Sequence, residues 1–230
     1  HDAAYWDFQL VLAAAKASAD TDPARADHLL KTLVDLNIES TDPSLAQRVY
    51  LAYGDLRLDQ GEYDSAIETW KRGLFVDAEL PALENNLPLL QHIAFAQIKN
   101  LSSKNDPEKA KEGPGKSEKD TEGSKDTELS PEIAECQDTL DRLESAITFQ
   151  ENALAGLPDS RITREARADR RQEIAVADWS LKVLNAEMNL FKVSSGETAA
   201  QAGEAATEEA IAEAIEKTIA EATSGLQDAL

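Results

Sequence analysis

The sequence predicts an all-α protein, built as an array of helical repeats followed by an antiparallel helical hairpin. Three observations predict this class. The chain is 42% hydrophobic but only 5% aromatic, and it is rich in residues that favour helix, such as Ala, Leu, Glu and Lys. Apolar residues recur at three- and four-residue intervals in most segments. Finally, one central stretch reads as two short helices placed back to back.

That central stretch covers residues 43–81. It predicts one helix over about 44–59 and a second over about 63–76, with a break at Gln60-Gly61. Small side chains stand where two antiparallel helices need to approach closely, namely at Gly54, Ala66 and Gly73.

The same stretch resembles the tetratricopeptide repeat (TPR), a helix-turn-helix unit of about 34 residues. The resemblance is carried by residues at or close to the signature positions of the family: Gly54, Leu58, Gly61, Tyr63, Ala66, Gly73 and Leu74. It departs from the family at Ala78, which stands in the place usually held by proline. The resemblance implies a surface that binds another protein and does not imply a reaction.

Residues 1–101 as a whole are expected to form the TPR-like array. Residues 1–41 read as a degenerate copy of the same unit, and residues 79–100 read as the helix that caps the array. Asp-Pro pairs at 22–23 and 42–43 predict helix starts, because the aspartate can cap the helix and proline suits its first position.

The remaining chain divides into three parts. Residues 102–130 contain one large apolar side chain, Leu129, and cannot bury enough apolar surface to offset the entropy of ordering, so they predict a disordered polar linker. Residues 131–193 predict the hairpin, and residues 194–230 an acidic, Ala/Glu-rich, weakly helical tail.

The hairpin is predicted from a seven-residue repeat of apolar side chains that starts after Ser130-Pro131. Trp179 lies off this seam and is our candidate for a contact with the repeat array. The seam positions of the first helix are Ile133, Cys136, Leu140, Leu143, Ile147, Gln150, Leu154 and Leu157, of which Gln150 alone is polar, and those of the second are Ile174, Ala177, Leu181, Leu184, Met188 and Phe191.

The net charge of −21 limits the kinds of molecule that this chain can bind. An acidic chain is repelled by phosphate backbones and by anionic lipid, so we expect neither nucleic-acid binding nor direct membrane-surface binding by this segment. A protein with a basic, apolar segment is the complementary partner, although the acidic residues could also serve solubility alone. With Cys136 as its one cysteine, the chain can form no internal disulfide and no cysteine-based zinc site.

No sequence motif for catalysis or nucleotide binding is present, so we expect no enzyme, no cofactor and no metal site. His28 and His92 are isolated in helical apolar contexts and are expected to be packed or half-exposed. His1 indicates a processed chain, a fragment or a tag remnant, and a preceding signal or anchor would not be visible.

The resemblance to TPR proteins implies that the first helix of the repeat lines a concave groove. The groove positions would be Arg48, Leu51, Ala52, Asp55, Leu58 and Asp59. An apolar groove with acidic edges suits a basic, apolar helix or loop, although the leucines could equally pack against neighbouring helices. TPRs that bind chaperone tails hold asparagines where this chain has Ala52 and Asp55, so capture of a peptide carboxylate is not expected.

A second candidate site is a basic helical face formed by Arg164, Arg167 and Arg171. It could bind an acidic partner or the acidic tail. Alternatively, these arginines pair within their own helix with the interleaved acidic residues, which are Glu165, Asp169 and Glu173.

These patterns predict a non-catalytic adaptor or assembly factor. The repeat, together with Asn86-Leu87, also resembles small TPR proteins encoded beside bacterial von Willebrand-type and AAA+ ATPase genes in methanol-oxidation or aerotolerance clusters. That resemblance implies a factor for metalloenzyme maturation in the bacterial envelope, periplasmic or membrane-anchored, while a cytoplasmic location stays open. The alternative function is a structural subunit that forms homo-oligomers through the heptad-patterned hairpin.

Overall fold

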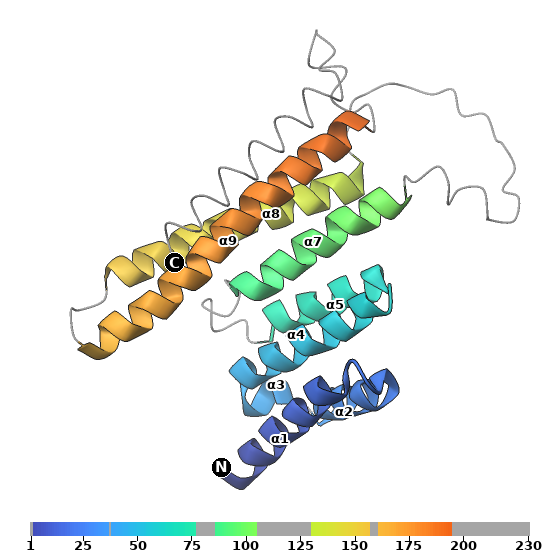
Figure 1. Cartoon of the computed structure of the whole chain (residues 1–230), viewed down its shortest axis with the longest axis vertical. Helices are drawn as coiled ribbons and strands as arrows, with labels where there is room; N and C mark the ends of the chain where they lie inside the picture. Colours follow the sequence, from blue (N-terminus) through green and yellow to red (C-terminus); the bar gives the residue numbers. More distant parts are fainter. Residues whose placement is uncertain (1, 37, 77–85, 105–129, 157–160, 195–230) are drawn as a thin grey trace, which may run out of the picture.

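The computed structural model describes residues 2–36, 38–76, 86–104, 130–156 and 161–194 (Figure 1). These ranges contain helices and no strand, so the all-α prediction is confirmed for them. The helices are α1 (Asp2–Ser18), α2 (Pro23–Asp35), α3 (Ile38–Thr41), α4 (Pro43–Asp59), α5 (Tyr63–Leu74), α7 (Leu87–Lys104), α8 (Pro131–Ala155) and α9 (Arg161–Ser194).

Several predictions lie outside the described residues. They concern the departure at Ala78, residues 105–129 of the linker predicted over 102–130, the seam position Leu157 and the acidic tail from residue 195 onward. Residues 102–104, which were predicted as linker, instead form the end of α7. The side chains of residues 161–166, which include Arg164, also lie outside the description, although their backbone belongs to α9.

The predicted helix starts are confirmed by their caps. In each, a side-chain oxygen accepts a hydrogen bond from a backbone N–H three residues later, and proline takes the first helical position: Asp22 with Arg25 (3.1 Å), Asp42 with Leu45 (3.0 Å) and Ser130 with Ile133 (3.4 Å). The start of α7 is built the same way, because Asn86 accepts from the backbone N–H of Leu89 at 3.1 Å. The helix expected over 79–100 therefore begins at Leu87, and Pro88 lies in its first turn, where it breaks no helical hydrogen bond.

The helices stack in chain order. Helix α1 packs on α2, and α4 packs on α5. The stack continues because α2 also contacts α4, α5 contacts α7, and α7 contacts both α8 and α9. Figure 1 shows this succession from α1 at the bottom to α8 and α9 at the top.

Two of the three small residues of the central stretch, Gly54 and Gly73, lie at a close helix–helix contact, as predicted, and the third, Ala66, is buried. A Cβ atom added to Gly54 would come within 2.1 Å of Trp70 Nε1, and one added to Gly73 within 2.9 Å of Tyr50 Cβ. Trp70 is fully buried, and its Nε1 donates a hydrogen bond to the backbone oxygen of Leu51 at 3.1 Å. The indole thus occupies the space that the absent Gly54 side chain leaves.

Two clusters of apolar side chains form the core. One joins α1, α2, α3 and α4, and the other runs without interruption through α5, α7, α8 and α9. Every predicted seam position from Ile133 to Ile147 and from Ile174 to Phe191 is buried in this second cluster, and Leu154 packs partly against it. Burial raises the pKa of the Cys136 thiol to about 12, so this side chain behaves as a small neutral apolar group.

Helices α8 and α9 contact each other along the second cluster. Lys192, near the end of α9, donates a hydrogen bond at 2.8 Å to Gln137, near the beginning of α8. None of the helices that the structure describes has both the length and the apolar character needed to cross a membrane.

Candidate functional site: a groove between α4, α7 and α9

A groove of about 490 Å³ opens between α7, α9 and the end of α4. We call it the α7–α9 groove. Phe95 and Val176 in its wall remain 40% and 39% exposed, unlike the core residues beside them. Its other principal wall residues are Leu58, His92, Trp179 and Glu187. The groove therefore offers accessible apolar surface in a concave setting, which is typical of a binding site.

Contacts between α7 and α9 hold the groove in shape. Gln91 Nε2 donates a hydrogen bond to Ser180 Oγ at 2.9 Å. Two turns further along α7, Lys99 Nζ lies 3.5 Å from Glu187 Oε1 and 5.4 Å from the centre of the Phe95 ring. The two helices are thus tied together on both sides of the apolar wall, so a ligand need not assemble the groove.

A polar pair, Asp55 and His92, lies beside Leu58 at the α4 side of the groove. His92 Nδ1 lies 2.7 Å from the backbone oxygen of Pro88, and because that oxygen only accepts, Nδ1 must carry the hydrogen. His92 Nε2 lies 3.4 Å from Asp55 Oδ1, so it presents a second N–H to the carboxylate only when the imidazole is protonated. The ring also packs against Trp70, with 5.3 Å between ring centres.

Burial is the main influence on Asp55. It raises the pKa of this carboxyl above its usual 3.8, and the neighbouring His92 opposes the shift. The Asp55 side chain is 45% exposed overall, but its Oδ1 is buried, so the cost of desolvation falls on one oxygen. A cation delivered to this oxygen would favour the charged carboxylate.

Two buried polar atoms of the groove wall, Trp179 Nε1 and Glu187 Oε2, make no hydrogen bond within the described part of the chain. A third buried atom, Asp55 Oδ1, lies beside the groove, and its described contact is the 3.4 Å ion pair with His92 Nε2. Buried polar atoms are nearly always paired in native proteins, so each of the two wall atoms marks a place where a ligand atom would be accommodated. The groove thus presents one donor and one anionic acceptor, and Asp55 adds a second acceptor beside it.

The predicted groove residues of α4 are distributed over several environments. Leu58 lines the groove and Asp55 lies beside it, whereas Asp59 is exposed. Leu51 packs partly against the core of α5, α7, α8 and α9, and Arg48 is exposed, with its guanidinium 3.2 Å from Gln9 Oε1.

Ala52 packs against the other core, that of α1 to α4. Packing against helix neighbours, the alternative reading for the leucines, thus accounts for part of the environment of Leu51 and Leu58.

The basic face of α9 lies away from this groove. Arg171 is exposed and Arg167 is partly buried, and neither lines the groove. Nearby, Arg170 forms an ion pair with Glu173 at 2.6 Å, which is one kind of intrahelical pairing that the sequence suggested.

Sequence reasoning missed most of the groove wall. It expected His92 to be packed or half-exposed, without a role in a site, and did not single out Phe95, Val176 or Glu187. A signal was nevertheless present: Val176, Trp179 and Val183 are spaced by three and four residues, and they form a second apolar stripe on α9 beside the seam.

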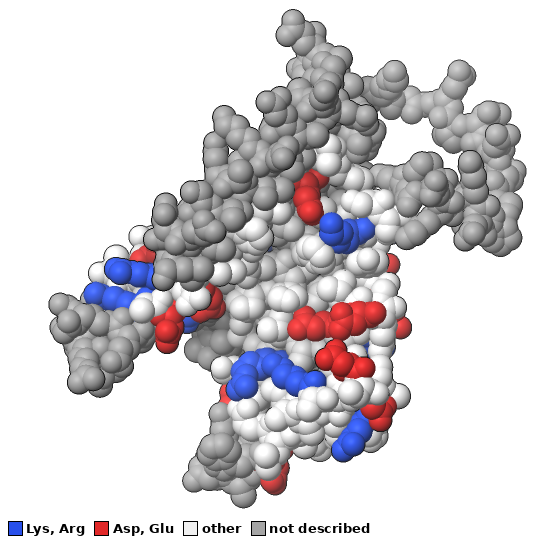
Figure 2. Space-filling model, viewed as in Figure 1, with Lys and Arg blue, Asp and Glu red and all other residues white. Residues whose placement is uncertain are grey.

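Figure 2 shows the face on which α4, α7 and α9 lie. Acidic side chains lie over α4 with basic side chains beside them, while the surface over α7 is mostly uncharged. The acidic side chains next to this uncharged surface are the part that a basic segment would complement.

The described residues include no group of three or more His, Cys, Asp or Glu side chains placed to hold a metal ion. No protein-family model, no curated protein and no solved structure matches this chain.

Proposed function

We propose that this chain is a non-catalytic adaptor or assembly factor that holds a segment of another protein in the α7–α9 groove. One observation carries the proposal: a preformed apolar groove of about 490 Å³ holds two buried polar atoms, Trp179 Nε1 and Glu187 Oε2, that have no hydrogen bond among the described residues. A groove of this kind gains binding energy from apolar contact and orientation from its few polar atoms.

We further propose that the helices form a TPR-like array, with α1/α2 and α4/α5 as repeats and α8/α9 as an antiparallel hairpin. The stacking of successive helices supports this arrangement, as does the close contact at Gly54 and Gly73. In this arrangement α4 and α7 contribute to one continuous face. A role in metalloenzyme maturation in the bacterial envelope remains a prediction from the resemblance alone.

The proposed partner segment has a defined chemistry. Apolar side chains pack on Phe95 and Val176, and a lysine or arginine reaches Asp55 Oδ1 or Glu187 Oε2. A carbonyl oxygen accepts from Trp179 Nε1. The net charge of −21 adds long-range attraction for a basic segment.

Two synthetic helical peptides with the same apolar face test the proposal, one flanked by lysines and one by glutamates. Isothermal titration calorimetry with the full chain should show saturable binding of the lysine peptide only. The double variant Asp55→Asn/Glu187→Gln should bind it about tenfold more weakly, since two charge pairs of about 1 kcal/mol or less each are lost. Phe95→Ser should weaken binding through the apolar wall.

The matched control is Asp20→Asn/Asp35→Asn, which makes the same change in net charge at exposed positions outside the groove. It should leave the affinity almost unchanged. Equal binding of both peptides, or equal affinities for the groove and control variants, would refute a basic partner in this groove.

The alternative, a homo-oligomeric structural subunit, uses the heptad seam as its contact surface. In the described helices the seam residues are buried in the chain's own core, an observation that favours the adaptor. A concentration-independent species of 25.0 kDa in light scattering would eliminate the alternative.

A further inference from the structure

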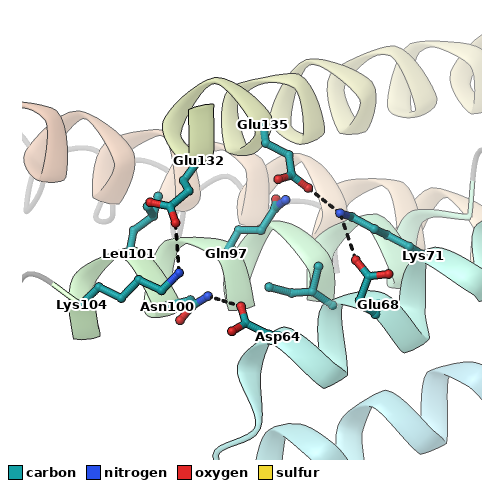
Figure 3. Close-up of a pocket in the computed structure, with 10 residues that line it drawn as sticks. Asp64, Glu68, Lys71, Gln97, Asn100, Leu101, Lys104, Glu132 and Glu135 are labelled. Atoms are coloured by element: carbon teal, nitrogen blue, oxygen red, sulfur yellow. Dashed lines mark hydrogen bonds and ion pairs between the residues drawn. The ribbon is translucent and has the colours of Figure 1, made fainter. Parts of the chain in front are cut away.

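A second cavity lies on the other flank of α7, between α5 and α8. We call it the α5–α8 pocket; its volume is about 190 Å³ (Figure 3). Whereas the α7–α9 groove is mainly apolar, this pocket is lined largely by charged and amide side chains. The share of liquid volume that one water molecule occupies is about 30 Å³, so the pocket is large enough for the end of a long side chain.

Negative charge exceeds positive charge in this pocket. Its four carboxylates come from α5 and α8, namely Asp64, Glu68, Glu132 and Glu135. Its two cations are Lys71 and Lys104. Four negative charges against two positive charges leave an excess of two.

The two lysines are already engaged. Lys71 pairs with Glu135 and lies 3.7 Å from Glu68, while Lys104 pairs with Glu132 at 3.1 Å. Figure 3 shows these pairs around the pocket, with Asn100 donating a hydrogen bond to Asp64. The internal pairs hold the carboxylates in place but leave the pocket with uncompensated negative charge.

An independent observation points to a ligand. Gln97, in the middle of α7, is only 6% exposed, and its Oε1 is buried without a hydrogen-bond partner among the described residues. Figure 3 shows its amide group directed between the charged side chains, toward Glu135. A buried amide oxygen of this kind is rarely left without a donor, so the pocket supplies a hydrogen-bond acceptor at its base.

We propose that the α5–α8 pocket binds an organic cation, an ammonium or guanidinium group such as the end of a lysine or arginine side chain of a partner protein. The N–H group donates to Gln97 Oε1, and the positive charge lies among the four carboxylates. The aliphatic stem packs against Ile67 and Leu101, which also line the pocket. A metal ion is a poorer match, because the described carboxylates form no ligating group of three or more.

This inference is independent of the α7–α9 groove, because the two sites share no lining residue. Loss of partner binding in the groove would therefore leave the pocket unaffected, and the converse also holds.

The test uses the full chain and three probes: N-acetyl-arginine amide, N-acetyl-lysine amide and putrescine. Titration calorimetry in constant sodium chloride should give saturable binding with a millimolar dissociation constant. In ¹⁵N-labelled protein, the Gln97 side-chain amide resonance should shift along the same saturation curve. Gln97→Leu should weaken binding about fivefold, as expected for one lost hydrogen bond.

Glu135→Gln should also weaken binding, and it gives a second readout should Gln97→Leu fail to fold by circular dichroism. The matched control is Glu144→Gln, an exposed glutamate of α8 outside the pocket, which should not change the affinity. Binding of the two amino-acid amides only would assign the pocket to partner side chains, and binding of putrescine only would assign it to a free polyamine. Absence of saturable binding, or affinities unchanged in Gln97→Leu and Glu135→Gln, would overturn the proposal.

Discussion

At Gly54 the backbone of α4 lies so close to Trp70 that an added methyl group would overlap the indole ring. Gly54→Ala should therefore force Trp70 to move and break its hydrogen bond to the backbone oxygen of Leu51. We expect a loss of about 3 kcal/mol in the free energy of unfolding, from overpacking together with the broken hydrogen bond. Urea unfolding followed by circular dichroism measures it.

The control for this substitution is Gly156→Ala. There a Cβ would lie 3.7 Å from its nearest neighbour, an ordinary contact distance, and the backbone already has a negative φ of −78°. The free energy of unfolding should change by about 0.5 kcal/mol or less. A comparable loss in both variants would show that the Trp70 contact does not cause the effect.

Asp55 gives the stability a pH dependence. Because its pKa is raised by burial above the usual 3.8, the folded chain binds more protons than the unfolded chain, and stability falls as the pH rises from about 4 through the raised pKa. Asp55→Asn removes this term. The variant should therefore become progressively more stable than the wild type over that interval and keep its advantage at neutral pH.

Thermal unfolding midpoints measured between about pH 3 and pH 7 would show this divergence. The unfolding midpoint of Asp20→Asn, a change at an exposed turn position, should differ from that of the wild type by the same amount at every pH. A difference between Asp55→Asn and the wild type that stays constant with pH would contradict the assignment to Asp55.

At the scale of the elements, α2, α4, α7 and α8 each begin at a side-chain cap. Asp42 accepts the hydrogen bond from Leu45 N at the beginning of α4, the helix that carries both Gly54 and Asp55. Asp42→Ala should lower the free energy of unfolding by about 1 kcal/mol, because one backbone donor of the first turn loses its partner. Asp20→Ala, which makes the same change outside a cap, should cost less, and chemical denaturation of both variants measures the difference.

The helices themselves were predictable because their signals are local. Each signal can be read from a short stretch of sequence. These signals are the Asp-Pro and Ser-Pro starts, the three- and four-residue apolar spacing and the small residues at 54 and 73. The short helix α3 was missed, because Ile38–Thr41 is a single turn and has no periodicity to detect.

The α7–α9 groove was not predictable in the same way. Its walls join residues about ninety positions apart, as the Gln91–Ser180 hydrogen bond shows. Periodicity identifies the apolar side of α9, but it does not reveal which helix faces that side. Leu58 and the neighbouring Asp55 were anticipated from the TPR resemblance, and Trp179, which lines the groove, was singled out because it lies off the seam.

The stability of the whole molecule depends on the continuity of the second core. One apolar cluster joins α5 and α7 to α8 and α9, although residues 105–129 separate α7 from α8 in sequence. A chain that ends after Lys104 would expose the side of α7 that contacts α8 and α9. Since uncovering even two large apolar side chains costs about 3 kcal/mol or more, this truncated chain should unfold at a clearly lower urea concentration.

The control is a chain that ends after Ser194, which retains every described helix. The 1–104 chain should unfold at a lower urea concentration than this control, because only the control keeps α8 and α9. A midpoint for the 1–104 chain equal to that of the full chain would mean that α8 and α9 do not contribute to the stability of the preceding helices.

Trp70 and Trp179 occupy opposite surroundings: the first is sealed between α4 and α5, and the second stands in the groove wall. The chain has a third tryptophan, Trp6, so the experiment uses the Trp6→Phe variant. In that variant the ultraviolet emission of the other two should respond differently to a dissolved quencher such as acrylamide, with Trp179 quenched and Trp70 shielded. A segment that binds in the groove would protect Trp179 from the quencher and shift its emission to shorter wavelengths. The emission of Trp70 should stay constant and serve as an internal reference. The protein thus carries its own optical reporter of occupancy and needs no attached dye.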